Sequence, residues 1–415
     1  MRWLSTFWII CLFDLGSYGQ EDTLWTARWL FDGQDLHTGY AVVVKGNRIQ
    51  QVGSYASLRR ARLTEKNLGE ATLMPGMMEG HAHLLLHPYN ETSWNDQVLK
   101  ESLAERVVRA VGHARTTLMA GFTTVRDLGS EGAGYADVGL KQSIDKGLIP
   151  GPRLLVAGPA IVATGSYGPK GFADHVDVPL GAEEADGDRL ISVVRDQIGK
   201  GVDFIKVYAD YRWGPQGEAR PTFTLTELKT MVDVAASSGR VVVAHASTAE
   251  GMRRAAEAGV ASIEHGDDGN REVYKLMREK QVALCPTLGA VEALAHYGGW
   301  KKGLDQDTER IKTKKRAFRE ALEAGVSILP GGDVGVFAHG DNVYELELMA
   351  EYGMSNLQVL RSVTSGSAQI LGLKELGQLK TGFVADMIAV KGNPLADLSA
   401  LKKVVLVMKD GQVYK

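Results

Sequence analysis

Two histidines stand one residue apart in the segment "MPGMMEGHAHL", residues 74–84. Side chains at positions i and i+2 of an extended strand point to the same face, so the imidazoles of His81 and His83 would lie side by side. Neutral imidazoles are common ligands of zinc and similar divalent ions. A histidine at a strand end is also often only a hydrogen-bonded packing residue, so the pair needs further ligands before it predicts a metal.

Four more polar residues stand in or directly after short apolar segments that have the composition of buried strands. They are Lys206 in "DFIKVY", His245 in "VVVAHA", His265 in "SIEHG" and Asp333 in "PGGD". A buried polar side chain is unfavourable unless it is paired, so this set indicates one shared site rather than four unrelated positions. Histidine and carboxylate ligands together suit zinc or a similar divalent ion.

Lys206 is the unusual member, because divalent cations would repel an ammonium group. Burial lowers the pKa of a lysine, and a neutral amine can react with carbon dioxide to form a carbamate. An N6-carboxylated Lys206 would offer two oxygens that could join two metals about 3.5–4 Å apart, the separation common in two-metal hydrolases. The alternative is a surface lysine that merely follows an isoleucine, although Lys206 lies between Ile205 and Val207.

The elements that must position these residues alternate along the chain. Eight short apolar runs between residues 72 and 370 are separated mostly by segments with helical periodicity, such as 102–121, 224–239 and 313–325, several of which end on glycine. Apolar strands alternating with amphipathic helices predict a parallel sheet covered by helices. Eight units predict an α/β fold of the (β/α)8 TIM barrel type, with the active site at the carboxyl ends of the strands. An open, doubly wound sheet is the alternative.

Both ends of the chain are β-rich. Strand-like runs flank Gly46-Asn47 near the start and Asp410-Gly411 near the end, and both dipeptides are typical of hairpin turns. We therefore predict one composite β-sandwich domain from residues 21–71 and 380–415. The barrel domain is expected to span residues 72–379.

Composition limits the partners and the location of the protein. The net charge of −3 gives no indication of nucleic acid or of an anionic membrane as a partner, and two cysteines exclude a disulfide framework and a cysteine-based zinc site. Residues 3–13 form a mostly apolar run that is too short to span a bilayer. We predict a signal peptide in residues 1–20 and hence a periplasmic or secreted protein. If this segment is an N-terminal strand instead, the protein would be cytoplasmic.

Taken together, the motifs resemble the amidohydrolase superfamily in its binuclear form with a carboxylated lysine. They are "PGMMEGHAHL", "TTVRDLG", "IKVY", "VVAHA", "SIEHG", "GGDVG" and the tail "ELELMAEYGMSNLQVLRSVTSGSAQILGL" followed by "GQLKTGFVADMIAV". The chain looks most similar to the prolidase and ochratoxinase group, which is related to imidazolonepropionate hydrolases. The resemblance implies two divalent ions, expected to be Zn, with the first bound by His81, His83, Lys206 and Asp333 and the second by Lys206, His245 and His265.

The resemblance also implies a reaction. The group cleaves amide, peptide-type bonds in dipeptides and N-acyl amino acids that carry a free carboxylate, a class that includes ochratoxin A, in the manner of a carboxypeptidase or dipeptidase. A metal-activated bridging hydroxide would attack the amide carbon, and Asp333 would pass its proton to the leaving amine. A cyclic amide or lactone hydrolase is the alternative substrate class. A non-catalytic scaffold is a third hypothesis, but such proteins usually lack several ligands.

Other site residues follow from the resemblance less directly. The segment "ATGSYGPKG" departs from the family pattern because Tyr167 takes the place of an expected histidine. Tyr167 is then a candidate oxyanion donor, with His175 as the alternative. From the segment "KVYADYRWG", Arg212, with Tyr208, is predicted to bind the substrate carboxylate in a two-pronged geometry, and a solvated loop arginine is the alternative. His339 is predicted to face the pocket. Relatives often assemble, so we expect a homo-oligomer, specifically an octamer.

Overall fold

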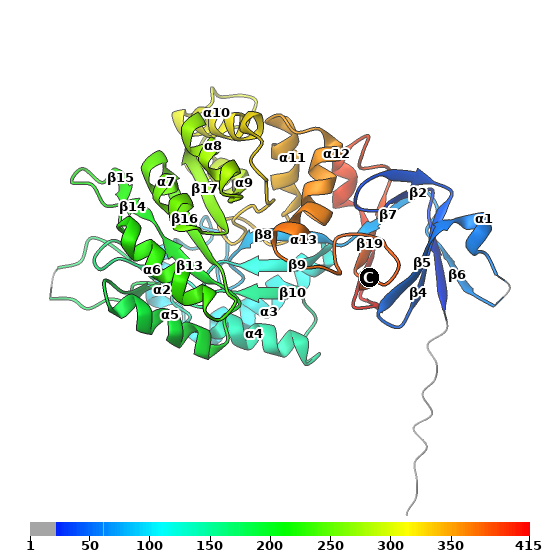
Figure 1. Cartoon of the computed structure of the whole chain (residues 1–415), viewed down its shortest axis with the longest axis horizontal. Coiled ribbons are helices and arrows are strands. Elements are labelled where there is room, and N and C mark those ends of the chain that lie inside the picture. Colours follow the sequence, from blue (N-terminus) through cyan, green and yellow to red (C-terminus); the bar gives the residue numbers. More distant parts are fainter. Residues whose placement is uncertain (1–21, 61, 174) are drawn as a thin grey trace, which may run out of the picture.

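The computed structural model describes residues 22–60, 62–173 and 175–415. A larger part, in which helices cover parallel strands, adjoins a smaller β-rich part that holds the C-terminus (Figure 1). The predicted signal peptide lies outside the described residues. Within the described ranges, none of the helices combines the length and the apolar character needed to cross a membrane.

The strands of the larger part form two parallel sheets. One has the order β10-β9-β8, and the other has the order β12-β11-β13-β16-β17-β18. Their bounds are β8 (Met77–Ala82), β9 (Phe122–Asp127), β10 (Arg153–Val156), β11 (Ile161–Val162), β12 (Glu183–Glu184), β13 (Ile205–Tyr208), β16 (Val242–Thr248), β17 (Ser262–Asp268) and β18 (Ala283–Cys285). A small antiparallel hairpin, β14 (Asp210–Arg212) and β15 (Ala219–Pro221), follows β13.

The structure differs from the predicted strand pattern at two places, and both differences have a local cause. The third run, RLLVAG, forms β10, and a further short strand that was not predicted, β11, follows it after Gly158, which has a left-handed φ of +67°, and Pro159. The eighth run makes only isolated parallel bridges, from Ile328 to β18 and from Val334 to β8. Between these two bridges the sequence Pro-Gly-Gly cannot maintain a regular ladder. The mixed α/β prediction is confirmed, whereas closure into a barrel stays a prediction.

The helices follow the predicted periodicity and capping. Helix α6 begins with a capping box in which Thr224 and Glu227 bond each other's backbone, and α7 and α10 end at Gly259 and Gly325 in left-handed conformation. Their bounds are α2 (Trp94–Lys100), α3 (Leu103–Met119), α4 (Ala136–Asp145), α5 (Arg189–Lys200), α6 (Leu225–Ala236), α7 (Ala249–Ala258), α8 (Arg271–Glu279), α9 (Leu288–Tyr297), α10 (Glu309–Ala324), α11 (Val343–Glu351), α12 (Asn356–Arg361), η1 (Ser362–Gly366) and α13 (Ser367–Ile370).

The β-rich part contains strands from both ends of the described chain. One sheet has the order β5-β4-β1-β6 and the other β21-β20-β19-β7-β2-β3, and side chains of both sheets share one hydrophobic cluster. The predicted turns at Gly46-Asn47 and Asp410-Gly411 are confirmed as hairpin connections. The elements are β1 (Thr23–Thr26), β2 (Trp29–Phe31), β3 (Leu36–Thr38), β4 (Tyr40–Lys45), β5 (Arg48–Ser54), α1 (Tyr55–Leu58), β6 (Thr64–Asn67), β7 (Ala71–Pro75), β19 (Met387–Lys391), η2 (Leu398–Lys402), β20 (Val404–Lys409) and β21 (Gln412–Val413).

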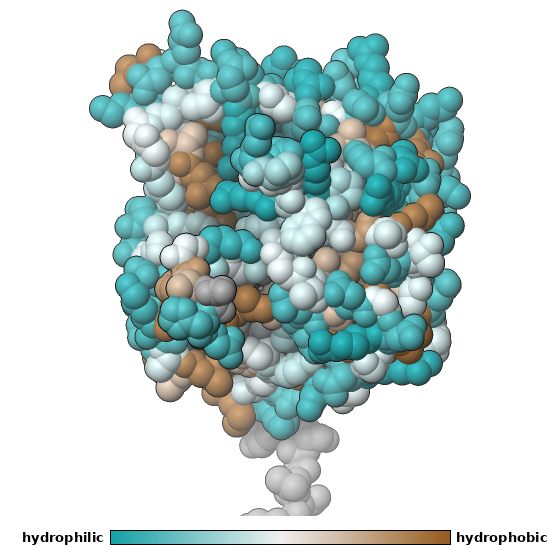
Figure 2. All heavy atoms as spheres, turned by 90° about the vertical axis from the view of Figure 1, so that its left-hand side faces the viewer, coloured by the Kyte–Doolittle hydropathy of each residue, from teal (hydrophilic) through white to brown (hydrophobic). Residues whose placement is uncertain are grey.

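The two parts are joined at Gly76, between β7 and β8. A Cβ atom on Gly76 would lie 2.1 Å from Thr123 Oγ1, so only glycine allows the chain to pass β9 at this distance. Strand β8 and the strands parallel to it run away from the β-rich part. Their carboxyl ends therefore lie toward the left-hand side of Figure 1, a face that is largely hydrophilic with hydrophobic patches at its margins (Figure 2).

Candidate functional site

A cavity of about 190 Å³ opens at the carboxyl ends of the parallel strands. Five of the six predicted metal ligands line it, namely His81, His83, His245, His265 and Asp333. They come from β8, β16, β17, the residue after β8 and the loop that follows the eighth apolar run. The sixth, Lys206 on β13, is buried with an exposed fraction of 1%.

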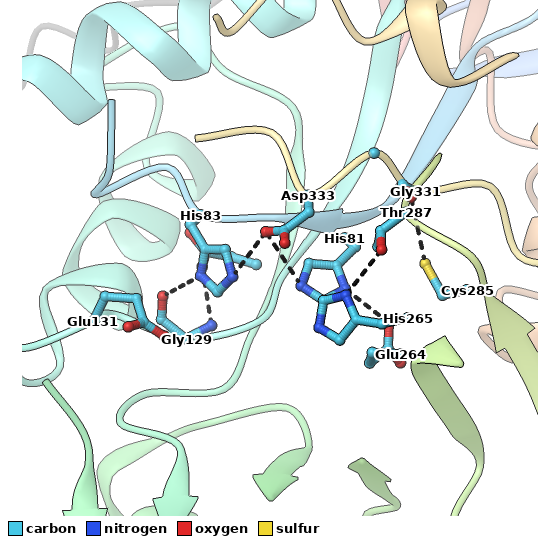
Figure 3. Close-up of polar contacts among 12 residues, drawn as sticks. His81, His83, Gly129, Glu131, Glu264, His265, Cys285, Thr287, Gly331 and Asp333 are labelled. Carbon is cyan, nitrogen blue, oxygen red and sulfur yellow. Dashed lines mark hydrogen bonds and ion pairs between the residues drawn. The ribbon is translucent and has the colours of Figure 1, made fainter. Parts of the chain in front are cut away.

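His81, His83 and Asp333 form a compact group of ligand atoms. Asp333 Oδ1 lies 3.5 Å from His81 Nε2 and 3.4 Å from His83 Nε2, and both imidazoles point toward this carboxylate (Figure 3). Their ligand atoms all lie within 4.8 Å of one another. Two imidazoles and one carboxylate at this spacing are a donor set that fits a divalent ion.

Each of three imidazoles has its Nδ1 atom held by a neighbouring oxygen. The contacts run from His81 to Glu264 Oε2 (3.0 Å), from His83 to the Gly129 carbonyl (2.9 Å) and from His265 to Thr287 Oγ1 (2.8 Å). A partner on Nδ1 fixes the ring orientation and tautomer of a metal-binding histidine and leaves Nε2 available. The strands and loops around the cavity therefore present these rings in a fixed orientation.

His245 and His265 form the second group, adjacent to the first. Their ring centroids are 4.5 Å apart, and the His265 ring lies 5.0 Å from that of His81. Tyr208 stacks on His245 at 4.5 Å, while Lys206 Nζ lies 5.5 Å from the centroid of the Tyr208 ring. The four imidazoles thus occupy one continuous region of the cavity wall, and Lys206 lies buried behind Tyr208 and His245.

Burial disfavours the charged form of His81, His245, His265 and Lys206. Desolvation, followed by the charge of Lys206, lowers the pKa of His81 well below its ordinary value and lowers that of His245 to about 3. Desolvation, followed by the charges of His245 and His81, also lowers the pKa of His265 well below its ordinary value. Burial lowers the pKa of Lys206 as well, and its amine has no hydrogen bond or ion pair among the described residues. Metal ligands must be deprotonated, so this environment suits metal binding.

Backbone strain is concentrated at the same cavity. Six non-glycine residues of the described ranges have a positive φ, and four of them line the cavity: Glu131 (49°), His265 (72°), Thr287 (50°) and Asp333 (64°). Such conformations are unfavourable for residues with a side chain and persist where the surrounding structure imposes them. This distribution is typical of a functional site.

The structure brings only some of the other predicted residues to the cavity. Tyr167, Tyr208 and Arg212 line it, and Arg212 is exposed at its mouth on β14. His339 does not line it, because its Nε2 contacts the Leu86 carbonyl at 3.0 Å and its ring stacks on another histidine. His175 is exposed and is likewise absent from the cavity lining.

Several lining residues were not predicted from the sequence. Glu131, Tyr89, Asp267 and Arg310 all contribute to the cavity wall. Glu131 could have been noticed, because it follows the strand segment "TTVRDLG" by two residues, at the level where the other polar residues occur. The Glu131 carboxylate accepts hydrogen bonds from Tyr167 at 2.8 Å and from the Trp94 indole at 2.9 Å.

A family model settles the relationship of the chain. The model described as "Amidohydrolase family" matches residues 72–414. The chain belongs to the amidohydrolase family. The predicted resemblance is therefore confirmed, and the membership supports a hydrolase. Amidohydrolases are typically metal-dependent, which agrees with the group of His81, His83 and Asp333.

Individual relatives place this amidohydrolase near the expected group. Ochratoxinase of Aspergillus niger is 29% identical over 419 residues, covering 92% of this chain and 84% of the relative. A crystal structure of a Xaa-Pro dipeptidase with bound methionine in the active site has a TM-score of 0.83 and 31% identity, covering 95% and 100% of the two chains. A prolidase complexed with N-methylphosphonate-L-proline has a TM-score of 0.82 and 26% identity, covering 95% and 99%. Similarity to the prolidase and ochratoxinase group is thus confirmed.

Proposed function

We propose that this amidohydrolase is a binuclear metal-dependent enzyme that hydrolyses the amide bond of dipeptides or N-acyl amino acids with a free carboxylate. Ochratoxin A belongs to this substrate class. The observation that carries the proposal is the convergence of four imidazoles and Asp333 on one cavity beside the buried amine of Lys206. The similarity to a Xaa-Pro dipeptidase and to ochratoxinase supports the substrate class.

The metal ligands follow the two groups of the cavity. His81, His83 and Asp333 would hold one zinc ion, and His245 and His265 would hold a second. Lys206 would join both after its neutral amine reacts with carbon dioxide, which forms an N–C bond and releases one proton. When bound, the two ions supply Lewis-acid chemistry, since they lower the pKa of water and polarise a carbonyl oxygen.

Asp333 is assigned the proton transfer. Burial raises the pKa of its carboxyl group, although the nearby His83 and Lys206 oppose this shift. A carboxylate with a raised pKa can accept a proton from the attacking water and return it to the amine that leaves. Its left-handed backbone holds the carboxylate between His81 and His83, beside the position of the reacting bond.

Arg212 and Tyr208 are assigned to the substrate carboxylate. Arg212 stands exposed at the cavity mouth, where its guanidinium can approach a carboxylate with two parallel N–H groups. Burial, followed by the charge of Glu131, raises the pKa of Tyr167 and of Tyr208 well above the ordinary value, so both hydroxyls stay protonated. The Tyr167 hydroxyl donates its single hydrogen to Glu131 at 2.8 Å, so it would act as an oxyanion donor only after giving up this bond.

We also propose a fold for each of the two parts of the chain. A closed (β/α)8 barrel is supported by the parallel pairing and by the two bridges of the eighth run, but it would begin at β8 and not at residue 72, because β7 pairs within the β-rich part. A composite β-sandwich is supported by the hydrophobic cluster that both small sheets share. Export through residues 1–20 and assembly into a homo-octamer stay predictions, which N-terminal sequencing of the mature protein and light scattering would test.

Removal of the metal tests the function directly. Prolonged chelation should abolish hydrolysis of a dipeptide such as Met-Pro, and added zinc should restore it, faster in the presence of bicarbonate if Lys206 must be carboxylated again. Hydrolysis that persists in protein shown to be metal-free contradicts the mechanism. A lactone without a carboxylate that is hydrolysed faster than every acyl amino acid contradicts the substrate class.

A further inference from the structure

Glu131 is a buried carboxylate that lines the cavity beside the His83 imidazole. Its exposed fraction is 3%, and it stands next to Gly129, whose carbonyl holds His83 (Figure 3). Its backbone adopts a left-handed φ of 49°, a strained conformation for a residue with a side chain. The chain therefore holds this particular carboxylate in the cavity wall against the local backbone preference.

The contacts of Glu131 leave its charge without a cationic partner. One carboxylate oxygen, Oε2, accepts hydrogen bonds from Tyr167 and Trp94, while Oε1 has only a long contact of 3.4 Å with Tyr208. Arg106 binds the main-chain carbonyl of Glu131 rather than the carboxylate. No ion pair of the Glu131 side chain occurs among the described residues. A buried carboxylate normally has a cationic partner.

The aromatic residues that donate hydrogen bonds to this carboxylate pack against one another and against Tyr211. The Tyr167 ring lies 5.3 Å from Trp94, 4.7 Å from Tyr208 and 4.9 Å from Tyr211, measured between centroids. Tyr167 and Tyr211 line the same cavity as this carboxylate, and a carboxylate together with aromatic rings can bind an ammonium group, because both the charge and the ring quadrupoles attract a cation. Arg212 also lines the cavity and suits an anion, so the cavity wall carries groups for both signs of charge.

We propose that Glu131, with the rings of Tyr167 and Tyr211, forms a subsite for a cationic nitrogen of the substrate. This inference rests on the proposed amide hydrolysis and deepens it, because it selects substrates that carry an ammonium group over acylated ones. The ammonium has two chemical sources. It is either the free α-amino group of a dipeptide or the side chain of a lysine residue in it.

Two pairs of ligands, in each of which one member lacks the ammonium group, distinguish the sources. Methionine is compared with N-acetylmethionine for the α-ammonium group, and Nα-acetyllysine is compared with N-acetylnorleucine for the side-chain ammonium. Binding to the zinc-loaded full-length protein is measured by calorimetry, and turnover of Met-Pro is measured in parallel. Wild-type protein should bind the cationic member of one pair more tightly.

Glu131→Gln keeps the shape and the hydrogen-bond acceptor but removes the charge. The preference for the cationic member should fall by about 10- to 100-fold, the range expected for a hydrogen bond to a charged group. Glu91→Gln is the matched control, because Glu91 is 56% exposed and lies outside the cavity lining. This control variant should retain the preference. If Glu131→Gln loses the preference in the methionine pair, the subsite binds the α-amino group. If it loses the preference in the lysine pair, the subsite binds the lysine side chain.

Two results overturn the inference. One is an unchanged preference in both pairs, and the other is an equal weakening of all four ligands, which would mean that Glu131 only shapes the pocket or balances the charge of the metal site. Ligand binding can be measured without turnover, so the test of the ammonium subsite is independent of the test of amide hydrolysis. An intact preference without any hydrolysis of Met-Pro refutes the proposed function but not the subsite.

Discussion

The core of the larger part contains two clusters of buried charged groups that differ in one respect. In the first, named here the Arg126 cluster, the guanidinium of Arg126 bonds the Gly80 carbonyl (2.7 Å), Ser262 Oγ (2.9 Å) and Glu264 Oε1 (2.8 Å). In the second, the metal-ligand cluster, Lys206 is buried to a similar degree but has no such partner. Arg126 is thus satisfied by the chain itself, whereas Lys206 is not.

The presence of hydrogen-bond partners indicates a structural role for Arg126, and their absence indicates a functional role for Lys206. A buried ion pair with all its hydrogen bonds satisfied holds strands together, and removal of one partner leaves an uncompensated charge. A buried amine without a partner is unfavourable for the folded chain, so its retention indicates a modification or a ligand that completes the site. The clusters meet at Glu264, whose other oxygen holds His81 Nδ1 at 3.0 Å.

The largest effect is expected for Lys206→Met. Methionine fills the buried position without a charge, so the thermal midpoint should stay within a few degrees or rise. Loss of the bridging ligand should lower kcat/KM for Met-Pro by about 10⁴-fold, because the second metal and its Lewis acidity are lost with it. Circular dichroism, zinc analysis and steady-state kinetics provide the measurements. A variant that keeps a tenth of the wild-type activity contradicts the assignment.

The next effect concerns stability and is expected for Arg126→Met. The substitution leaves the Glu264 carboxylate buried without its cation and should lower the free energy of unfolding by about 3–5 kcal/mol. Urea denaturation of the metal-free protein measures it without interference from zinc. The double variant Arg126→Met, Glu264→Gln should recover part of the loss. An unchanged midpoint for the single variant would mean that the Arg126 cluster is not structural.

A smaller effect is expected for Arg212→Ala, which alters the cavity rim but neither cluster. KM for Met-Pro should rise by about 10- to 100-fold as one charged hydrogen-bonded contact is lost, while kcat changes little. Stability should not change, because Arg212 is exposed. Arg220→Ala on the paired strand β15 is the matched control, since Arg220 is exposed but does not line the cavity. Unaltered dipeptide turnover in Arg212→Ala would require another carboxylate anchor, for which Arg310 is the available residue.

The sequence predicted the imidazoles of the site better than the rest of the cavity wall. His81, His83, His245 and His265 stand at fixed positions of parallel strands, so strand register alone brings them together. The positions of the other wall residues depend on loop conformation, which the hydrophobic periodicity of the sequence does not predict. His339 was predicted to face the cavity, but its ring contacts the Leu86 carbonyl instead. Glu131 follows a predicted strand by two residues, but the left-handed backbone that places it in the cavity wall was not predicted.

The fold was also predicted where local sequence determines it, and it was missed where single residues interrupt a strand. The alternation of apolar runs and amphipathic segments predicted the parallel strands and their helices, because burial and periodicity depend on local sequence. The structure departed from this pattern at two places, where Gly158-Pro159 and Pro330-Gly331 interrupt the backbone hydrogen bonds. Such breaks depend on one or two residues and carry little weight in a pattern that extends over a whole strand.

Anomalous diffraction at the zinc edge tests the central claim most directly. Crystals of protein never exposed to a chelator should show two zinc peaks, one among His81, His83 and Asp333 and the other beside His245 and His265. Extra density should extend from the nitrogen of Lys206 toward both peaks. Unmodified Lys206 in such crystals, or the absence of any peak at these residues, would contradict the account.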